Sequence, residues 1–242
     1  MRSEVMQDIY DPKFVEELFD EMSGSYERMN YITSFGFSAR WRRQLVEQAK
    51  LQEGQVVADL LTGMGECWKP ILKQVGPQGK LIALDFSEGM LRFARAYQQK
   101  FPGADIQILQ EDLFENSIPN QSVDRVISGL GMKTFSEAQI HSFAKEVYRM
   151  LKPGGKLSFM DVAVPNNKLL RWPYFFYLKR VIPVLGWLFI GNPENYRMLG
   201  IYSERFGNAE KFARIFREHG LQVEHQAYFY GCASGLVGSK PN

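Results

Sequence analysis

The chain has 242 residues, of which 45% are hydrophobic and 23% are charged, a composition typical of a globular protein with one large domain. Its 29 Lys and Arg against 27 Asp and Glu leave a net charge of only +2, which argues against nucleic-acid binding. The two cysteines, Cys67 and Cys232, match neither a metal-ligand spacing nor a disulfide framework, so we expect a cytoplasmic protein without a metal site.

Neither an export signal nor a membrane-spanning helix is expected. Residues 1–10 carry charged side chains where a signal peptide has an apolar core of about 7–15 residues. The most apolar stretch, residues 181–190, is about ten residues long, whereas a spanning helix needs about 20. Peripheral contact with a membrane surface stays open as a partner hypothesis.

Helices are predicted at the start of the chain. Between Pro12 and Met22 the apolar residues recur at intervals of three and four, as on one face of an amphipathic helix. A second helix is expected after Gly36 and extends to about Lys50. We therefore treat residues 1–50 as an N-terminal helical cap.

Five short apolar runs follow, separated by helix-like stretches or turns. They are Val56–Leu60, Leu81–Leu84, Ile106–Leu109, Val123–Ser128 and Leu157–Val162. Strands that alternate with helices predict a parallel sheet with right-handed crossovers. The predicted fold class is therefore α/β, with a doubly wound, mostly parallel sheet whose core spans residues 51–164.

Two of the helices between these strands are expected to begin at a serine. Ser87 and Ser136 each precede an amphipathic run, and their hydroxyls can accept a hydrogen bond from the first helical turn. The second of these helices should end before Lys152-Pro-Gly-Gly155, because proline cannot extend a helix and the glycines let the chain turn.

An aromatic-rich segment interrupts the sheet pattern over residues 165–206. It is longer than an ordinary connection, so we expect a helical insertion that covers one edge of the sheet. Residues 207–242 then supply a final helix over Ala209–His219 and two strands over Leu221–Phe229 and Cys232–Gly238, which we expect to form a hairpin.

The loop after the first strand is the sharpest local feature. Gly63 and Gly65 let the backbone turn tightly and approach a ligand closely, and the acids Asp59 and Glu66 flank them. The dinucleotide fingerprint needs three glycines, and two acids suit a pyrophosphate poorly. A ligand with sugar hydroxyls and a cationic centre fits better, because carboxylates accept hydrogen bonds from both. The alternative is a tight turn without a ligand.

Two further acids follow the next strands. Asp85 comes 26 positions after Asp59, near the spacing of an acid that binds ribose hydroxyls. Asp112 follows the third strand, so carboxylates from successive strand ends are expected to line one crevice. This favours a nucleoside ligand over the alternative of acids in solvated loops.

These motifs resemble, in order and spacing, those of class I S-adenosylmethionine-dependent methyltransferases. The matching segments are Asp59-Leu-Leu-Thr-Gly-Met-Gly-Glu66, Leu84-Asp-Phe-Ser-Glu-Gly-Met-Leu91, Asp112, Pro119-Asn-Gln-Ser-Val-Asp124 and Leu151-Lys-Pro-Gly-Gly155. Flanking segments resemble the UbiE-type ubiquinone/menaquinone C-methyltransferases, and these are Tyr26-Glu-Arg-Met-Asn30, Ser34-Phe-Gly36, Trp41-Arg-Arg43 and Asn195-Tyr-Arg-Met-Leu199. The resemblance covers about residues 12 to 239 and implies a Rossmann-like sheet.

The resemblance also implies carbon methylation of an electron-rich ring, with S-adenosylmethionine as the donor. By the same resemblance, Asp85 binds the ribose hydroxyls, Gly63, Met64 and Gly65 pass under the methionine part, Asp112 and Leu113 flank the adenine, Ser128 lines the pocket, and Tyr26 closes over it. Asp59 and Phe86 complete the expected cofactor-binding set.

Three departures from the family pattern alter the expected site. The family usually has Gly-Thr-Gly-Asp where this chain has Gly63-Met-Gly-Glu66, and Ala at the position of Leu61. After the fourth strand it has Gly-Leu-Arg-Asn, where this chain has Gly129-Leu-Gly-Met-Lys-Thr134 with Lys133 as the nearest basic residue. Near the end, Tyr-x-Tyr-Leu and Glu-Ser become Tyr196-Arg-Met-Leu199 and Ile201-Tyr202.

We therefore expect donor binding to be kept and the acceptor site to be rebuilt. Lys133, Tyr196 and Tyr202 are the candidate catalytic residues, for proton handling or contact with the acceptor. The first hypothesis is a C-methyltransferase of a hydroxylated aromatic or quinone-like ring, with or without a prenyl tail. The alternatives are an O- or N-methyltransferase of a secondary metabolite or lipid head group, and a non-catalytic binding or scaffold protein. A homodimer is a further partner hypothesis.

Overall fold

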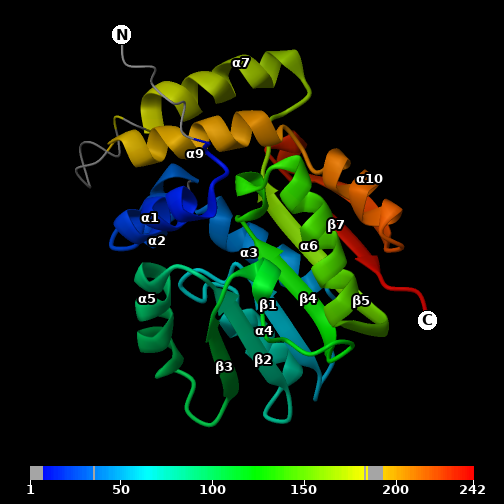
Figure 1. Ribbon diagram of the computed structural model, residues 1–242. Coiled ribbons are helices and arrows are strands. Elements are labelled where there is room, and N and C mark those ends of the chain that lie inside the picture. The colour runs from blue at the N-terminus through cyan, green and yellow to red at the C-terminus, as the bar shows by residue number, and fades with distance from the viewer. Residues whose placement is uncertain (1–7, 35, 183, 185–192) are drawn as a thin grey trace.

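A seven-stranded sheet forms the centre of the computed structural model, which describes residues 8–34, 36–182, 184 and 193–242 (Figure 1). The strands are β1 (Val56–Leu60), β2 (Lys80–Asp85), β3 (Asp105–Gln110), β4 (Val123–Gly129), β5 (Leu151–Val162), β6 (Gln222–Tyr228) and β7 (Ala233–Ser239). They lie in the order β3-β2-β1-β4-β5-β7-β6. The first five pair in parallel, and β7 lies antiparallel between β5 and β6. The predicted α/β sheet and its terminal hairpin are confirmed.

Helices cover both faces of this sheet. They are α1 (Pro12–Met22), α2 (Tyr26–Thr33), α3 (Phe37–Gln48), α4 (Trp68–Val75), α5 (Glu88–Gln98), α6 (Glu137–Met150), α7 (Lys168–Phe176), α9 (Pro193–Phe206) and α10 (Glu210–Glu218). Side chains of α6 and α10 pack with the strands in one apolar core, and those of α3, α4 and α5 pack in a second core on the opposite face. Burial on both faces explains why the parallel strands are continuous apolar runs.

The predicted helix starts are confirmed at both serines. The Ser87 hydroxyl accepts a hydrogen bond from the Met90 amide at the start of α5. Ser136 caps α6 in a reciprocal arrangement with Gln139, a capping box. The α6 helix ends at Met150, directly before the Lys152-Pro-Gly-Gly155 motif.

The Pro-Gly-Gly motif turns the chain within the bounds of β5. Val123 pairs with Leu151 and Arg125 with Lys156, so the one residue of β4 between these pairs opposes four of β5, and the register shifts there. Gly154 has a φ of +71°, in the left-handed region that favours glycine. The predicted boundary is therefore a bulge at the start of the strand.

The sequence pattern did not predict α2. Its eight residues bury only Tyr26 and Met29, which is too short a stripe to stand out as helical periodicity. These two side chains join α1, α5 and α9 in a third apolar cluster, which includes Leu18, Met90 and Met198. This cluster holds the N-terminal helices in place over the sheet.

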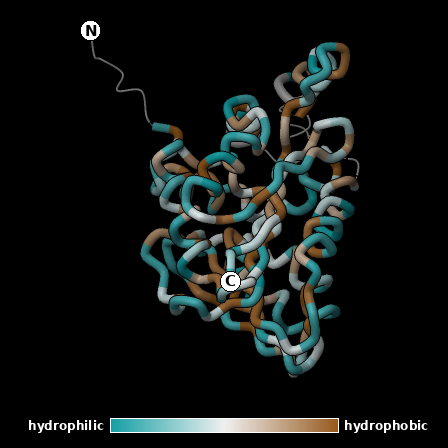
Figure 2. Tube along the Cα trace, turned by 90° about the vertical axis from the view of Figure 1, so that its right-hand side faces the viewer, coloured by the Kyte–Doolittle hydropathy of each residue, from teal (hydrophilic) through white to brown (hydrophobic). Residues whose placement is uncertain are grey.

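The aromatic-rich insertion is helical, as predicted, over its described residues. The α7 helix continues into a π-helical turn, η3 (Tyr177–Val181), and α9 follows residues outside the described part. Both α7 and α9 lie above the strand ends rather than beside an outer strand (Figure 1). Figure 2, turned by 90°, shows α7 standing away from the body with hydrophobic positions along it. No helix among the described residues is long and apolar enough to cross a membrane.

Candidate functional site

Two cavities meet at the carboxyl ends of the parallel strands, where ligands bind in open α/β sheets. We call them the donor cavity, with about 790 Å³ of empty space, and the acceptor cavity, with about 1280 Å³; both volumes include space open to solvent. Tyr26 from α2 and Leu130, directly after β4, line both cavities. A molecule in one cavity can therefore face a molecule in the other across these two side chains.

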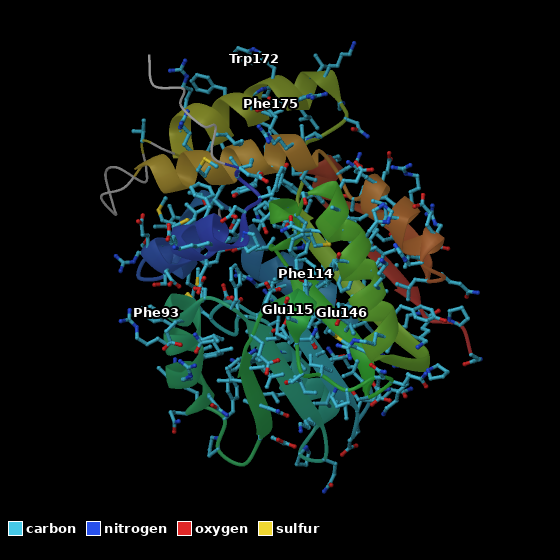
Figure 3. The ribbon with its side chains drawn as sticks, viewed as in Figure 1. Phe93, Phe114, Glu115, Glu146, Trp172 and Phe175 are labelled. Atoms are coloured by element: carbon cyan, nitrogen blue, oxygen red, sulfur yellow. The ribbon has the colours of Figure 1, made fainter. Side chains whose placement is uncertain are left out.

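Residues that follow β1, β2 and β3 form the floor of the donor cavity. They include Gly63 after β1, Asp85 at the end of β2 with Phe86 directly after it, and Asp112 and Leu113 after β3. A further aromatic residue, Phe114, lines the same cavity and lies near the centre of the molecule in Figure 3. Six of the ten predicted cofactor-binding residues, Tyr26, Gly63, Asp85, Phe86, Asp112 and Leu113, thus lie around one cavity.

The other four predicted residues do not line this cavity. Asp59 and Ser128 are buried beneath it, and the hydroxyl of Ser128 has no hydrogen-bond partner among the described residues. Met64 lines a separate surface groove instead. Gly65, with a φ of +86°, lies against the ring of Trp68, and a Cβ there would stand 2.7 Å from it. Direct contact of these four with a ligand stays a prediction.

Asp59 supports the glycine loop from below. Its carboxylate accepts a hydrogen bond from the Thr62 hydroxyl at 2.6 Å, and Thr62 Oγ1 accepts one from Trp68 Nε1 at 2.8 Å. Burial raises the pKa of Asp59 to about 7, although the Thr62 hydrogen bond opposes this. The chain of three side chains fixes the loop between β1 and α4.

Asp85 is the best-placed acid for sugar hydroxyls. One carboxylate oxygen accepts from the Gly63 amide at 2.8 Å and the other from the Ser87 amide at 3.1 Å. Burial raises its pKa to about 6, while the backbone hydrogen bonds from Gly63 and Ser87 lower it. Each carboxylate oxygen keeps a second lone pair, so the fixed carboxylate can still accept from a ligand.

The N-terminal segment covers the donor cavity. Val15 and Phe19 of α1 line this cavity, as does Tyr10, which lies just before α1. Asp20 ties α1 to the start of α5, because its Oδ1 accepts hydrogen bonds from the Ser87 hydroxyl and from the Gly89 amide, the latter at 2.9 Å. The sequence analysis did not identify these residues, since their role depends on contact between segments 67 or more positions apart.

An ion pair lies at one wall of the donor cavity. Arg42 of α3 contacts Glu66 at 2.7 Å, and both side chains are about nine-tenths buried. The second Glu66 oxygen accepts from the Met64 amide at 3.1 Å. Glu66 occupies the position where the family usually has Asp, and Arg42 neutralises it in the structure.

The donor cavity fits S-adenosylmethionine by the chemistry of its groups. Carboxylates of Asp85 and Asp112 offer acceptors for ribose hydroxyls and for an exocyclic amine. The apolar side chains Phe86, Leu113 and Phe114 offer flat surface to an adenine ring. Glu66 is already paired with Arg42, but its carboxylate oxygens keep lone pairs that can accept a hydrogen bond from an amino group.

The acceptor cavity is mostly apolar and aromatic. Its described lining comes from α2, α3, η3, α7, α9 and the ends of β4 and β5, and includes Phe37, Trp41, Tyr174, Tyr177, Leu199 and Phe229. Lys133 is the one charged residue in this described lining. Tyr177 also ties the insertion to the body, because its hydroxyl donates to the Thr33 carbonyl at 2.7 Å.

Lys133 is held by a buried acid that the sequence analysis did not identify. Its Nζ lies 2.9 Å from Asp161 Oδ1 and also donates to the Leu130 carbonyl, while its own amide donates to Asp161 Oδ2 at 3.0 Å. Asp161 is fully buried on β5. An ammonium group has three N–H donors, so one remains for a molecule in the acceptor cavity.

The other two candidate catalytic residues are placed differently. Tyr202 of α9 is fully buried in the third apolar cluster, and its hydroxyl donates to the Ile9 carbonyl. It lines neither cavity, so the structure gives no support for a catalytic part. The backbone of Tyr196 belongs to α9, but its side chain lies outside the described residues, and its role stays a prediction.

Leu61 and Gly131, two departures from the family pattern, contact each other in the structure. Leu61 packs against Gly131, where an added Cβ would stand 2.6 Å from a Leu61 methyl carbon. Gly131 occupies the position of the family's Arg in Gly-Leu-Arg-Asn, and Leu61 the position of its Ala. Because Leu61 is larger than alanine, it leaves room only for a glycine at position 131.

Comparison with known proteins places these motifs in context. The model of the ubiE/COQ5 methyltransferase family matches residues 6–240. The "Demethylmenaquinone methyltransferase" of Symbiobacterium thermophilum is 30% identical over 235 residues, 94% of this chain and 93% of the relative. The protein of the same name from Geobacillus sp. is 27% identical over 227 residues, 93% of this chain and 96% of the relative.

Solved structures show the same fold at low sequence identity. A SAM-dependent methyltransferase from Aquifex aeolicus superposes with a TM-score of 0.58 at 21% identity, covering 81% of this chain and 88% of its own. A putative S-adenosyl-L-methionine-dependent methyltransferase from Methanococcus maripaludis gives a TM-score of 0.59 at 21% identity, covering 96% and 94%. The class I methyltransferase fold expected from the motifs is confirmed.

Proposed function

Since the chain belongs to the ubiE/COQ5 methyltransferase family and is an S-adenosylmethionine-dependent enzyme, we propose that it methylates a ring carbon of a hydroxylated, quinone-like acceptor. The observation that carries this proposal is the contact between the two cavities at Tyr26 and Leu130, with a single cation, Lys133, in the described lining of the second. The names of the relatives, demethylmenaquinone methyltransferase, support the same class of acceptor.

The acceptor cavity suits a flat, electron-rich ring. Aromatic side chains such as Trp41 and Tyr174 can pack against a ring. No Asp or Glu belongs to the described lining, and the buried Asp161 carboxylate behind it is paired with Lys133. The Lys133 ammonium stabilises such an oxygen, and an ionised ring oxygen makes the neighbouring ring carbon more nucleophilic.

The residues of this chain act by orientation and charge. When bound, S-adenosylmethionine supplies a methyl group that the ring carbon takes with its own electron pair, while the sulfur keeps the pair of the broken carbon–sulfur bond. Tyr26 and Leu130 set the approach of the two molecules. The methylated ring carbon then releases its proton to water, because no carboxylate or imidazole belongs to the described cavity lining. The ring regains its aromaticity in this step.

Product analysis tests this function. The purified protein is incubated with S-adenosylmethionine carrying a ¹³C-methyl group and with reduced 1,4-naphthoquinone as the acceptor. The proposal expects one labelled methyl on a ring carbon, seen by mass spectrometry and by the carbon chemical shift. A labelled methoxy product would overturn carbon methylation, and donor binding without any labelled product would favour the binding-protein hypothesis.

We further propose that α7 contacts an anionic membrane surface, from which an acceptor with an apolar tail is taken. Its outer side exposes Leu169 and Trp172, at 85% and 76%, while Tyr174 on its inner side lines the acceptor cavity. Trp172 lies on the outer side of α7 in Figure 3. Residues 162–193 contain four basic residues and no acid, so a second copy placed symmetrically on this surface would bring like charges together. The exposed basic residues Lys168 and Arg171 of α7, together with its exposed apolar residues, suit anionic lipid head groups.

Trp172→Gln is expected to weaken binding to phosphatidylglycerol vesicles at least tenfold, because a side chain of this size contributes about 2 kcal/mol or more when buried. Cosedimentation with vesicles measures this, and Tyr31→Gln, which alters an exposed aromatic residue of α2, is the matched control. Turnover of the tail-less naphthoquinol should not change. Loss of self-association in place of lipid binding would instead identify α7 as a homodimer contact and contradict the membrane proposal.

A further inference from the structure

Asn30 has the features of an unassigned acceptor-binding residue. It lies one helical turn after Tyr26 on α2, and its side chain lines the acceptor cavity. Its amide nitrogen, Nδ2, is buried and has no hydrogen-bond partner among the described residues. Burial raises the pKa of the nearby Tyr26 hydroxyl, and the interaction with the Asn30 side chain is the smallest of the influences that lower it. The Asn30 side chain therefore lies beside Tyr26, which lines both cavities.

A buried amide without a partner needs an explanation. Most buried polar atoms in folded proteins are hydrogen-bonded, because an unmade bond destabilises the fold. The other unpartnered side-chain atom in the described part is Ser128 Oγ, next to Gly129 of the donor cavity. Ser128 itself lines neither cavity, so Asn30 Nδ2 is the unpartnered side-chain atom of the described part that belongs to a cavity-lining residue.

We infer that Asn30 donates a hydrogen bond from Nδ2 to an oxygen substituent of the acceptor ring, and so forms an oxygen-binding subsite together with Lys133. This inference rests on the proposed function and names the ring feature that the site selects. Lys133 offers one N–H from a second wall of the same cavity, and the surrounding residues are largely apolar. Two donors in an apolar cavity favour a ring with two oxygen substituents over a ring with one.

The two hydrogen-bond donors, Lys133 and Asn30, differ in charge. Lys133 carries a full charge that Asp161 holds in place, so it suits an ionised oxygen. Asn30 is neutral, so it suits the second oxygen, whether hydroxyl or carbonyl, as a donor. A site built to hydrogen-bond a substrate oxygen discriminates strongly against an analogue that lacks it, because the protein group is then left without a partner.

Asn30→Leu tests the inference, because leucine is similar in size and has no donor. The assay compares the reduced 1,4-naphthoquinone, which has two ring oxygens, with 1-naphthol, which has one. We expect kcat/KM for the two-oxygen acceptor to fall about 10- to 100-fold, the range of one buried hydrogen bond. We expect kcat/KM for 1-naphthol to change less than threefold and the Kd for S-adenosylhomocysteine to change less than twofold.

Two further measurements separate this role from a structural one. Asn30→Leu is expected to leave Tm unchanged or to raise it, because it removes an unpartnered polar group; a structural amide would lower Tm when replaced. Arg28→Gln, at an exposed position on the same helix, is the control and should alter neither acceptor. If Asn30→Leu unfolds, Asn30→Ala provides the same comparison.

The outcomes distinguish this inference from the proposed function. If the unmodified protein methylates neither reduced 1,4-naphthoquinone nor 1-naphthol, the proposed function fails. If it methylates both and Asn30→Leu reduces the two activities equally, or reduces neither, the oxygen-binding subsite is wrong while the function stands. The subsite is supported if the unmodified protein prefers the two-oxygen acceptor over 1-naphthol in kcat/KM and Asn30→Leu loses this preference.

Discussion

Asp85→Ala is expected to reduce the affinity for S-adenosylmethionine at least 100-fold, while the far-UV circular dichroism of the protein stays unchanged. A charge-assisted hydrogen bond contributes about 1.5–3 kcal/mol, and two ribose hydroxyls bound to one carboxylate therefore account for a factor of this size. The variant also leaves the amides of Gly63 and Ser87 without their acceptor, which loosens the glycine loop.

Isothermal titration calorimetry with S-adenosylhomocysteine measures this effect. Glu88→Gln is the matched control, because Glu88 is a nearby acid whose ion pair with Arg95 is half-exposed. It should leave the Kd unchanged. Retained binding by Asp85→Ala would remove this residue from the ribose site.

The raised pKa of Asp85 adds a pH dependence with a defined sign. Its pKa is about 6 in the folded chain, so the carboxylate that accepts the hydroxyls is lost as the pH falls through about 6, and donor affinity should fall with it. The folded-state pKa lies above the usual value of about 3.9 for an unfolded chain. This group therefore stabilises the fold below about pH 4, and that contribution is lost as the pH rises through about 6. Asp85→Asn should flatten both profiles.

Lys133→Met is expected to lower turnover by about 100- to 1,000-fold, in the range for loss of a group that stabilises charge at the reacting centre. The same change leaves the buried Asp161 carboxylate without its cation, which costs about 3–5 kcal/mol of unfolding free energy. Stability and catalysis are therefore both affected in the single variant.

A double variant separates the two effects. Lys133→Met with Asp161→Asn removes both charges, so stability should recover in a urea titration while turnover stays low. Lys152→Met is the control, because it removes an ion pair with Asp124 that is partly exposed, and such a pair contributes about 1 kcal/mol or less. Recovery of turnover in the double variant would contradict a direct role for Lys133.

The sheet was predictable because its signals are local. Each parallel strand is buried on both faces, so it reads as a short apolar run such as Val56–Leu60, which is β1 to the residue. The helix starts at Ser87 and Ser136 were predictable for the same reason, since a cap involves only residues within one turn. Donor-cavity residues at strand ends, Asp85 and Asp112, follow directly from the strand pattern.

The acceptor side and the cover of the donor cavity were less predictable because they are built from distant segments. Asp161 reaches Lys133 across 28 positions, and Asp20 reaches Ser87 across 67. Neither acid is part of a local pattern; Asp161 lies inside the run Leu157–Val162, which was predicted only as a strand. Asn30 was noted as part of a family-like motif, but its unpartnered amide becomes visible only when α2 is placed beside the cavity.

Tyr202 illustrates how a sequence position can mislead. It lies close to a departure from the family pattern, which made it a candidate for acceptor contact. In the structure its ring is fully buried against Tyr10 and its hydroxyl donates to the Ile9 carbonyl. Helical periodicity does not say which of two apolar environments, cavity or core, a face of α9 meets.

A crystal structure with bound S-adenosylhomocysteine tests the central claim, the division of the site into a donor and an acceptor cavity that meet at Tyr26 and Leu130. We expect both ribose hydroxyls within about 3 Å of the Asp85 carboxylate and the sulfur atom directed toward the acceptor cavity. A nucleoside bound away from Asp85, or a sulfur atom directed away from Tyr26 and Leu130, would contradict it.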